Sequence, residues 1–334
     1  MRIIIAAALL VAASAIVAGL LAGGADSGED TVRVAFFPNI GHAIPVVGLE
    51  NGVFASGLGN TTISAKIFDS GPQAIEALFA DSIDLAYVGP GPAINGFIKS
   101  SEKKVVILAG AASGGASLVL HPDSGIKSVD DFAGKRIAAP QIANTQDVSL
   151  RHYLSENGLN SAEKGGSVYV INVPNPDIYT LFVKGDIDAA WAPEPWATIL
   201  VDQLGGERMF NEEELWPDGR FASVLLVSKA SYAQENPDII LEWIESHKKT
   251  ESWINEHPEE TRMIFNRYME QELGSAFPDD VIDAALSNIE ITSDPITESV
   301  DEFAKRSDSL GYLGRHGYTL DGIFYQPGDN TEAP

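Results

Sequence analysis

Four segments of the chain combine glycine with small polar side chains of the kinds that hold anions. Three of them follow apolar runs that are predicted strands, and one opens a predicted helix. Glycine lets a ligand come close to backbone N–H groups, and a helix start adds unpaired donors and the positive end of the helix dipole. Each segment alone could be an ordinary turn, but four together favour a site for a small oxyanion that needs no lysine or arginine. The segments are Pro38–His42, Val88–Pro92, Ser113–Ser117 and Asn144–Asp147.

The most unusual stretch is Trp191–Trp196, in which Glu194 lies between two prolines and two tryptophans at the end of a predicted strand. The prolines restrict the backbone, so the carboxylate has a fixed direction. In a cleft it would oppose a simple anion but suit a zwitterion, whose ammonium and alkyl groups could pack on the aromatic rings. The alternative is a rigid hinge in which backbone donors satisfy Glu194. His42 also has two interpretations, a donor to a bound anion or a packing and capping residue.

The sequence lacks the motifs that mark common catalytic sites. It has no G-x-x-x-x-G-K-[ST] phosphate loop, no G-x-S-x-G elbow and no H-E-x-x-H metal motif. It also has no cysteine, which excludes disulfides, thiolate metal sites, iron–sulfur clusters and a cysteine nucleophile. We therefore expect a binding protein rather than an enzyme, with no catalytic residue, no metal and no cofactor.

The elements that must position these segments alternate between strand and helix. This alternation predicts an α/β protein in which open, mostly parallel sheets are covered by helices on both faces, with ligands at the carboxyl ends of the strands. Residues Ala77–Ala93 and Thr180–Ala197 share a pattern, Ile-Asp-x-Ala-aromatic and then a proline-containing loop, which favours two lobes of similar build. The predicted strands are 32–37, 62–68, 83–88, 105–109, 135–139, 168–173 and 187–192, and the predicted helices are 44–54, 72–80, 93–99, 145–157 and 176–183.

The N-terminus and the charge indicate where the protein works. Residues 1–24 are mostly apolar and carry no charged side chain other than Arg2, which predicts a signal peptide or an N-terminal membrane anchor, followed by a polar linker at 25–31. We expect an exported protein, in the periplasm or at the outer face of the cytoplasmic membrane. The 334 residues include 47 acidic and 22 basic side chains, a net charge of −25. A surface this negative repels phosphates, so we expect no nucleic-acid partner.

In order and spacing, the motifs resemble those of the substrate-binding proteins of ABC importers in the nitrate, taurine and aliphatic-sulfonate family. The resemblance runs from about Val32 to about Leu313. It implies a two-lobed, type II periplasmic-binding-protein-like fold, in which two crossover hinge strands join the lobes and the ligand is held in the cleft. The matching segments are FFPNIGHA, FDSGPQAIEAL, SIDLAYVGPGPAINGF, AASGGASLVL, SVDDFAGKRIAAP, NTQD and GDIDAAWAPEPW.

The resemblance also implies where the lobes and the ligand residues lie. Lobe 1 would comprise 32–119 and 224–313, lobe 2 would comprise 120–223, and 314–334 would be a tail. The crossings would fall near Leu118–His121 and Phe221–Val227. The implied ligand residues are Asn39, His42, Gly89, Gly91, Ser113 and Gly114 from the first lobe, and Thr145, Gln146, Trp191 and Glu194 from the second.

The implied function is to capture a small organic anion or zwitterion by cleft closure, as a monomer, and to deliver it to an ABC permease and its ATPase. An aliphatic sulfonate or taurine-like compound is favoured over nitrate or bicarbonate because the matching loops contain no lysine. Two alternatives remain open: a sensor module, and a binding protein for nitrate, bicarbonate or a thiamine-pyrimidine precursor. The related thiamine-pyrimidine synthases use a cysteine motif that this chain lacks. The family's common lipoprotein cysteine is missing too, so a membrane tether would have to be the N-terminal segment.

Overall fold

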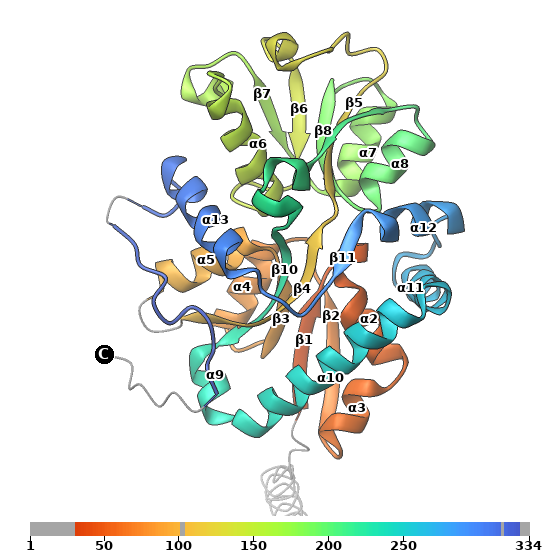
Figure 1. Cartoon of the computed structure of the whole chain (residues 1–334), viewed down its shortest axis with the longest axis vertical. Coiled ribbons are helices and arrows are strands. Elements are labelled where there is room, and N and C mark those ends of the chain that lie inside the picture. Colours follow the sequence, from red (N-terminus) through yellow and green to blue (C-terminus); the bar gives the residue numbers. More distant parts are fainter. Residues whose placement is uncertain (1–30, 101–103, 315–316, 328–334) are drawn as a thin grey trace, which may run out of the picture.

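The computed structural model of the protein describes residues 31–100, 104–314 and 317–327. Two β-sheets with helices around them lie one above the other, each forming the centre of a lobe (Figure 1). The two-lobed α/β architecture predicted from the sequence is therefore confirmed. The predicted leader, 1–24, lies outside the described residues, as does the linker at 25–31 apart from its last residue.

The first lobe is built on a six-stranded sheet with the order β11-β4-β10-β3-β1-β2. The strands are β1 (Thr31–Phe36), β2 (Thr62–Ile67), β3 (Leu85–Val88), β4 (Val105–Gly114), β10 (Ala222–Lys229) and β11 (Ile289–Ile291). The helices are η1 (Ile40–His42), α2 (Ala43–Glu50), α3 (Val53–Leu58), α4 (Gly71–Phe79), α5 (Pro90–Lys99), α9 (Ala230–Glu235), α10 (Pro237–Glu256), α11 (Pro258–Leu273), α12 (Asp279–Ser287) and α13 (Thr297–Ser309).

The second lobe is built on a five-stranded sheet with the order β7-β6-β8-β5-β9. Its strands are β5 (Ala116–Leu120), β6 (Arg136–Ala139), β7 (Tyr169–Asn172), β8 (Ala189–Pro193) and β9 (Glu207–Asn211). Its helices are η2 (Val129–Phe132), α6 (Thr145–Glu156), η3 (Ala162–Lys164), α7 (Asn175–Val183), α8 (Trp196–Asp202), η4 (Glu212–Leu215) and η5 (Pro217–Gly219).

Both sheets are mixed, because each lobe takes in a strand that arrives from the other lobe. In the first sheet, β1 is parallel to β2 and β3, whereas β10 is antiparallel to β3 and β4. In the second, β6 is parallel to β7 and β8, whereas β5 is antiparallel to β8 and β9. A strand that enters from the neighbouring lobe starts at the carboxyl edge of the sheet, so it runs against the strands that end there. Apart from β11, which is antiparallel to β4, the remaining strands of each sheet run in one direction, so the expectation of mostly parallel sheets is confirmed, with β10 and β5 as the reversed crossover strands.

The chain crosses between the sheets at positions a few residues from those expected. Strand β4 ends at Gly114 in the first sheet and β5 begins at Ala116 in the second. The chain returns to the first sheet with β10, at Ala222. The crossings therefore precede Leu118 and lie at the start of the segment Phe221–Val227. From the strands in each sheet we propose lobe boundaries at about 115 and 221, where the resemblance implied 119 and 223.

The described part of the C-terminal tail belongs to the first lobe. The Ile107 N–H donates to the Ile323 carbonyl at 2.7 Å, and the Tyr325 N–H donates to the Ile107 carbonyl at 2.8 Å. Ile323 is also buried. The first lobe thus extends beyond the limit of 313 expected for it.

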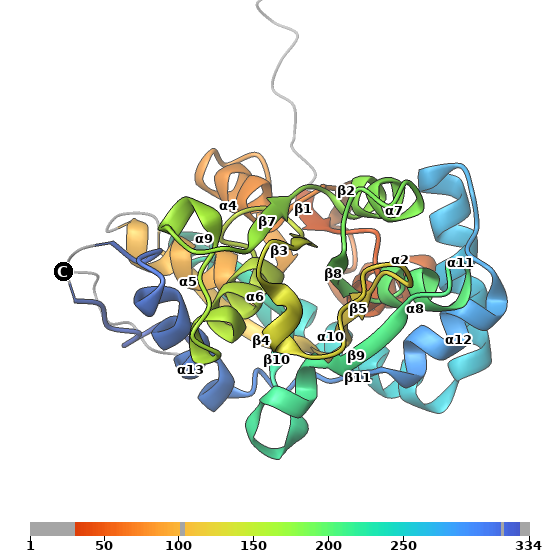
Figure 2. The ribbon, with the colours of Figure 1, turned by 90° about the horizontal axis from the view of Figure 1, so that it is seen from above.

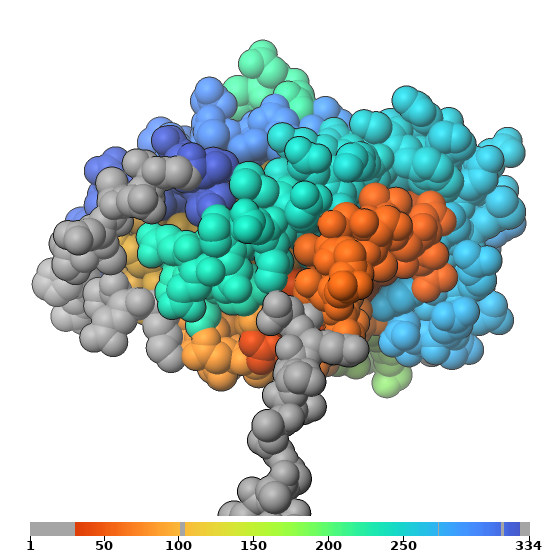
Figure 3. Space-filling model, turned by 90° about the horizontal axis from the view of Figure 1, so that it is seen from below, coloured from red at the N-terminus to blue at the C-terminus, as the bar shows by residue number. Residues whose placement is uncertain are grey.

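The central strands of each sheet are buried on both faces, which explains why they are apolar runs rather than alternating patterns. On the face of the first lobe that points away from the second, α10 packs across α2 and α3, and Figure 3 shows these segments side by side. There the rings of Phe54 and Trp243 stack with centroids 4.2 Å apart. The single helix predicted at 44–54 is divided in two, because Gly52 adopts a left-handed backbone with φ of 68°.

Seen from above, α13 lies beside α6 and α12 lies beside α8 (Figure 2). The lobes therefore touch on both sides of the crossings. Among the described residues, no helix has the length and apolar character needed to cross a membrane.

Candidate functional site

A cavity of about 540 Å³ lies between the lobes at the carboxyl ends of the central strands. Segments that follow β1, β2 and β3 line it from the first lobe, and segments that follow β6, β7 and β8 line it from the second. The crossing residues Gly114, Gly115, Ser223 and Val224 also line it, together with Ser275, Phe277 and Ile289 of the first lobe. This is the place where open α/β sheets bind ligands.

The cavity is surrounded by helix N-termini. The residues that precede the first residue of η1, α4, α5, α6 and α7 all line it. The helix starts turn the positive ends of their dipoles toward this space, although the N–H groups of η1 are already hydrogen-bonded and α4, α5 and α7 carry proline in their first turns. None of the residues that line the cavity is a lysine or an arginine. A small anion held here would be neutralised by backbone dipoles and neutral donors. These preceding residues are Asn39, Ser70, Gly89, Asn144 and Pro174.

Three hydroxyl groups in the cavity wall have no hydrogen-bond partner within the described residues. They belong to Ser70, Thr145 and Ser223, and their oxygens are buried. The amide oxygen of Asn175 is in the same situation. Buried polar atoms in native proteins are nearly always hydrogen-bonded. Four unpartnered atoms around one cavity therefore indicate groups whose hydrogen bonds a bound ligand would supply. The hydroxyls can donate to an oxyanion, whereas the Asn175 oxygen can accept from a ligand N–H or O–H.

His42 contributes a neutral donor. Its side chain is fully buried, and burial lowers the pKa of the imidazole to about 3. Its Nδ1 accepts from the Phe37 N–H at 3.3 Å, which places the proton of the neutral ring on Nε2. His42 is buried and also lines the cavity. The two interpretations from the sequence, an anion donor and a packing residue, can therefore both apply to it.

Glu194 lines the cavity, but its charge is already paired. One carboxylate oxygen accepts from Arg208 at 3.0 Å and from Asn288 at 2.9 Å, and the other accepts from the Thr198 N–H at 3.0 Å. Arg208 comes from β9 in the second lobe, whereas Asn288 comes from the first. The arrangement resembles the hinge alternative raised by the sequence, although side chains as well as a backbone N–H supply the donors. Glu194 therefore joins the lobes and adds little negative potential to the cavity.

The rim carries the free carboxylates. Asp69, next to Ser70, and Asp177, in the first turn of α7, line the cavity and are exposed to solvent. The cavity thus has donors in its wall and two carboxylates at its edge, a combination that suits a compound with an anionic head and a cationic or polar end. Among the described residues, no group of histidines, aspartates and glutamates is arranged to hold a metal ion.

The structure brings most of the implied ligand residues to this cavity and leaves three outside it. Gly91 packs between the lobes, where an added Cβ would lie 3.1 Å from the Ala143 carbonyl oxygen. The Ser113 hydroxyl accepts from the Phe221 N–H at 3.3 Å. Trp191 is fully buried in the second lobe, and its ring N–H donates to Glu212 at 2.7 Å. Those that line the cavity are Asn39, His42, Gly89, Gly114, Thr145, Gln146 and Glu194.

Sequence reasoning about the site overlooked Ser70, Ser223, Asn175 and the two rim aspartates. Ser70 had a usable signal, because it precedes Gly71-Pro72 at a helix start and follows a predicted strand. Asn175 likewise follows a predicted strand. Ser223 had none, because it lies in the return crossing and reaches the cavity only through the packing of the two lobes.

Comparisons with known proteins agree with this architecture. The model of the NMT1-like family matches residues 25–268. A putative aliphatic sulfonates-binding protein of Bacillus subtilis is 24% identical over 303 residues, which are 89% of this chain and 87% of that protein. The taurine-binding periplasmic protein of Escherichia coli is 26% identical over 179 residues, 54% of this chain and 53% of that protein.

A solved structure has the same fold. The alkanesulfonate-binding protein SsuA from Xanthomonas axonopodis pv. citri, bound to MOPS, superposes with a TM-score of 0.71 at 17% identity, over 85% of this chain and 94% of that one. The two-lobed binding-protein fold and the family resemblance predicted from the sequence are confirmed.

Proposed function

Because the chain belongs to the NMT1-like family, we propose that it is the extracytoplasmic solute-binding component of an ABC importer and that it captures an aliphatic sulfonate or a taurine-like zwitterion. The carrying observation is the convergence of helix N-termini and unpartnered hydroxyls from both lobes on one cavity without a lysine or arginine. A sulfonate offers three oxygens and a single negative charge, so several neutral donors can hold it. The names of the sulfonate- and taurine-binding relatives support the same class.

Binding would close the lobes around the ligand, since donors from both lobes contact it only when they meet. The closed form would then be presented to a permease with its ATPase, and the ligand would leave chemically unchanged. Residues 1–24 would direct export and, if retained, hold the protein at the outer face of the cytoplasmic membrane.

Calorimetry on the chain without residues 1–30 tests this proposal, with taurine, ethanesulfonate, nitrate, bicarbonate and a thiamine-pyrimidine precursor as ligands. We expect saturable binding of one sulfonate per chain and much weaker heats from nitrate and bicarbonate. Binding of nitrate or the pyrimidine alone would replace the proposed ligand with one of these alternatives. Binding of only uncharged or cationic compounds would overturn the anion site itself.

Glu194→Gln separates a ligand role of this carboxylate from a structural one. Because Arg208 already pairs with Glu194, the variant should lose about 2 kcal/mol of unfolding free energy, the usual worth of a hydrogen bond to a charged group. Its affinities for taurine and for ethanesulfonate should fall by the same factor, which calorimetry measures. A loss confined to taurine would instead show that Glu194 contacts the ligand ammonium group.

A further inference from the structure

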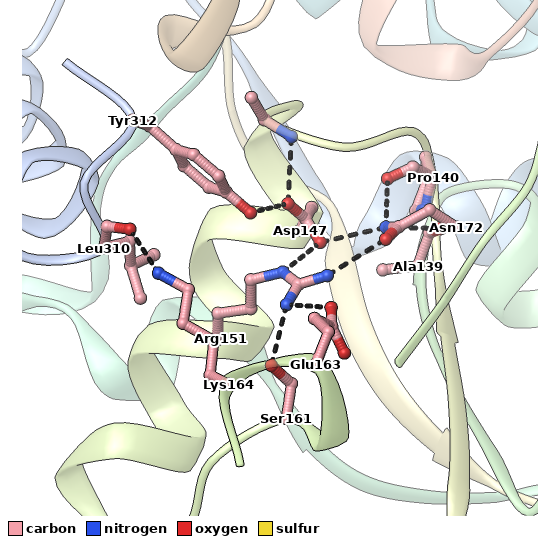
Figure 4. Close-up of polar contacts among 11 residues, drawn as sticks. Ala139, Pro140, Asp147, Arg151, Ser161, Glu163, Lys164, Asn172, Leu310 and Tyr312 are labelled. Carbon is pink, nitrogen blue, oxygen red and sulfur yellow. Dashed lines mark hydrogen bonds and ion pairs between the residues drawn. The ribbon is translucent and has the colours of Figure 1, made fainter. Parts of the chain in front are cut away.

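Beyond the cavity, the lobes also meet where the chain that follows α13 lies against α6 and η3 (Figure 4). We refer to residues 310–313 as the arm. The arm's Tyr312 hydroxyl donates to Asp147 in the second lobe at 2.7 Å, and its Leu310 carbonyl accepts from Lys164 at 2.7 Å. Close by, the Arg306 guanidinium lies 3.7 Å from the centre of the Trp216 ring. The two lobes therefore make a contact here that involves no residue of the cavity wall.

Asp147 is a fully buried carboxylate with donors from three separate parts of the chain. Its Oδ1 accepts from Arg151 at 2.7 Å and from Asn172 at 2.9 Å, both in the second lobe. Its Oδ2 accepts from the Ala143 N–H at 2.9 Å and from the Tyr312 hydroxyl. All four acceptor directions of the carboxylate are thus used. The loss or movement of one donor therefore changes the position in which the carboxylate can bond to the other three.

One of these donors belongs to a segment that faces the ligand cavity. Ala143 has a φ of 61°, a left-handed conformation that alanine rarely adopts, and the bond from its N–H to Asp147 holds it there. Its neighbours Asn144 and Thr145 line the cavity. We refer to residues 141–145 as the ligand loop. Asp147 therefore fixes the shape of the ligand loop with the same oxygen that accepts from the arm of the other lobe.

We infer that Asp147 is a positioning residue that couples the ligand loop to closure of the lobes through the Tyr312 hydroxyl. A ligand that orders the ligand loop would hold Asp147 where the Tyr312 hydroxyl can donate to it. The hydrogen bond from Tyr312 would in turn favour the ordered loop. Such coupling is reciprocal, so loss of the Tyr312 hydroxyl must weaken ligand binding although this hydroxyl touches no ligand. The inference rests on the proposed function only in that a ligand enters this cavity and the lobes close around it.

A purely structural role makes a different prediction. If Asp147 served only to fold the second lobe, Arg151 and Asn172 would be its important partners, and the Tyr312 hydroxyl could be removed without effect on ligand binding. Tyr312→Phe makes this distinction, because it removes one hydroxyl and leaves the second lobe untouched. Tyr318→Phe is the matched control: Tyr318 also packs partly buried in the first lobe, and no contact with the second lobe involves its hydroxyl among the described residues.

The readouts are the ligand dissociation rate and the closed fraction of the protein without ligand. The first is measured by stopped flow with taurine and ethanesulfonate. The second is measured by energy transfer between dyes on Lys66→Cys and Lys184→Cys, exposed positions on the first and second lobes. Because the natural chain has no cysteine, the dyes react only at these two sites.

Tyr312→Phe should raise the dissociation rate about 10- to 100-fold, as expected for one hydrogen bond to a carboxylate, and lower the closed fraction, while Tyr318→Phe leaves both unchanged. Equal values for the two variants would overturn the coupling. If the unaltered chain bound neither sulfonate, the proposed ligand would be wrong, and the coupling would be judged from the closed fraction without ligand. An unchanged closed fraction in Tyr312→Phe would then overturn it.

Discussion

Replacing Thr145 with valine should weaken sulfonate binding about 10- to 100-fold without lowering the melting temperature. The Thr145 hydroxyl lies in the cavity wall at the start of α6, and it is buried without a partner. In the complex it would donate to a charged oxygen, a hydrogen bond worth about 1.5–3 kcal/mol. In the free protein the same hydroxyl is a buried polar group without compensation, and valine of nearly the same shape removes that cost. The variant should therefore bind the sulfonate more weakly, whereas its melting temperature should stay the same or rise.

Thr261→Val is the control for this prediction. The Thr261 hydroxyl is also buried and unpartnered, but it lies in α11, away from the cavity lining. Its removal should give the same change in melting temperature as Thr145→Val and leave affinity as it was. Calorimetry with ethanesulfonate and thermal unfolding of the ligand-free proteins provide both numbers. If the two variants bound ethanesulfonate equally well, Thr145 would have no place in the anion site.

Gly89→Ala should leave each lobe folded but oppose the closed arrangement. Gly89 has φ of −71° and ψ of 164°, angles that alanine adopts without strain. An added Cβ would nevertheless lie 2.1 Å from the Thr145 hydroxyl oxygen and 3.2 Å from the Thr145 Cβ, both in the other lobe. Overpacking of this kind costs about 1–3 kcal/mol. We therefore expect the affinity for ethanesulfonate to fall about 10-fold or more.

The cause of that loss can be checked in the same protein. The closed fraction measured by energy transfer should fall in Gly89→Ala, and it should recover when Thr145→Ala is added, because the second change removes the hydroxyl that the new methyl group meets. Gly317→Ala is the control, since an added Cβ there meets no atom within 4 Å. A normal closed fraction in Gly89→Ala would show that the lobes adjust to the methyl group at this contact.

The sequence predicted the starts of α4 and α6 because their signals are local: Pro72 lies in the first turn of α4, and Asn144 accepts a hydrogen bond from the N–H of the next residue. Such patterns depend on a few consecutive residues, so they can be identified before the fold is known. The sequence placed the start of α5 at Ala93 instead of Pro90 and predicted no helix at η1. The order of the same segments along the chain also identified the family.

Other features depend on residues that are distant in sequence, and only the tertiary structure decided them. Glu194 had two interpretations from the sequence, a contact with a ligand ammonium group or a rigid hinge, and the structure pairs it with Arg208, 14 residues away, and with Asn288, 94 residues away. Trp191 lies in a core because its position in β8 turns the ring toward Glu212 and away from the cavity.

By itself, then, the sequence determined the alternating elements and the loops at their ends, since these follow from local backbone preferences and hydrophobic periodicity. It indicated the family through the order and spacing of its motifs. The tertiary structure decided which polar groups are already satisfied and which remain available, because a partner such as Tyr312, 165 residues from Asp147, is chosen by the packing of two lobes. Short-range patterns contain no information about that distance in space. The chemistry of the cavity is therefore a property of the lobes' contact as much as of the residues that line it.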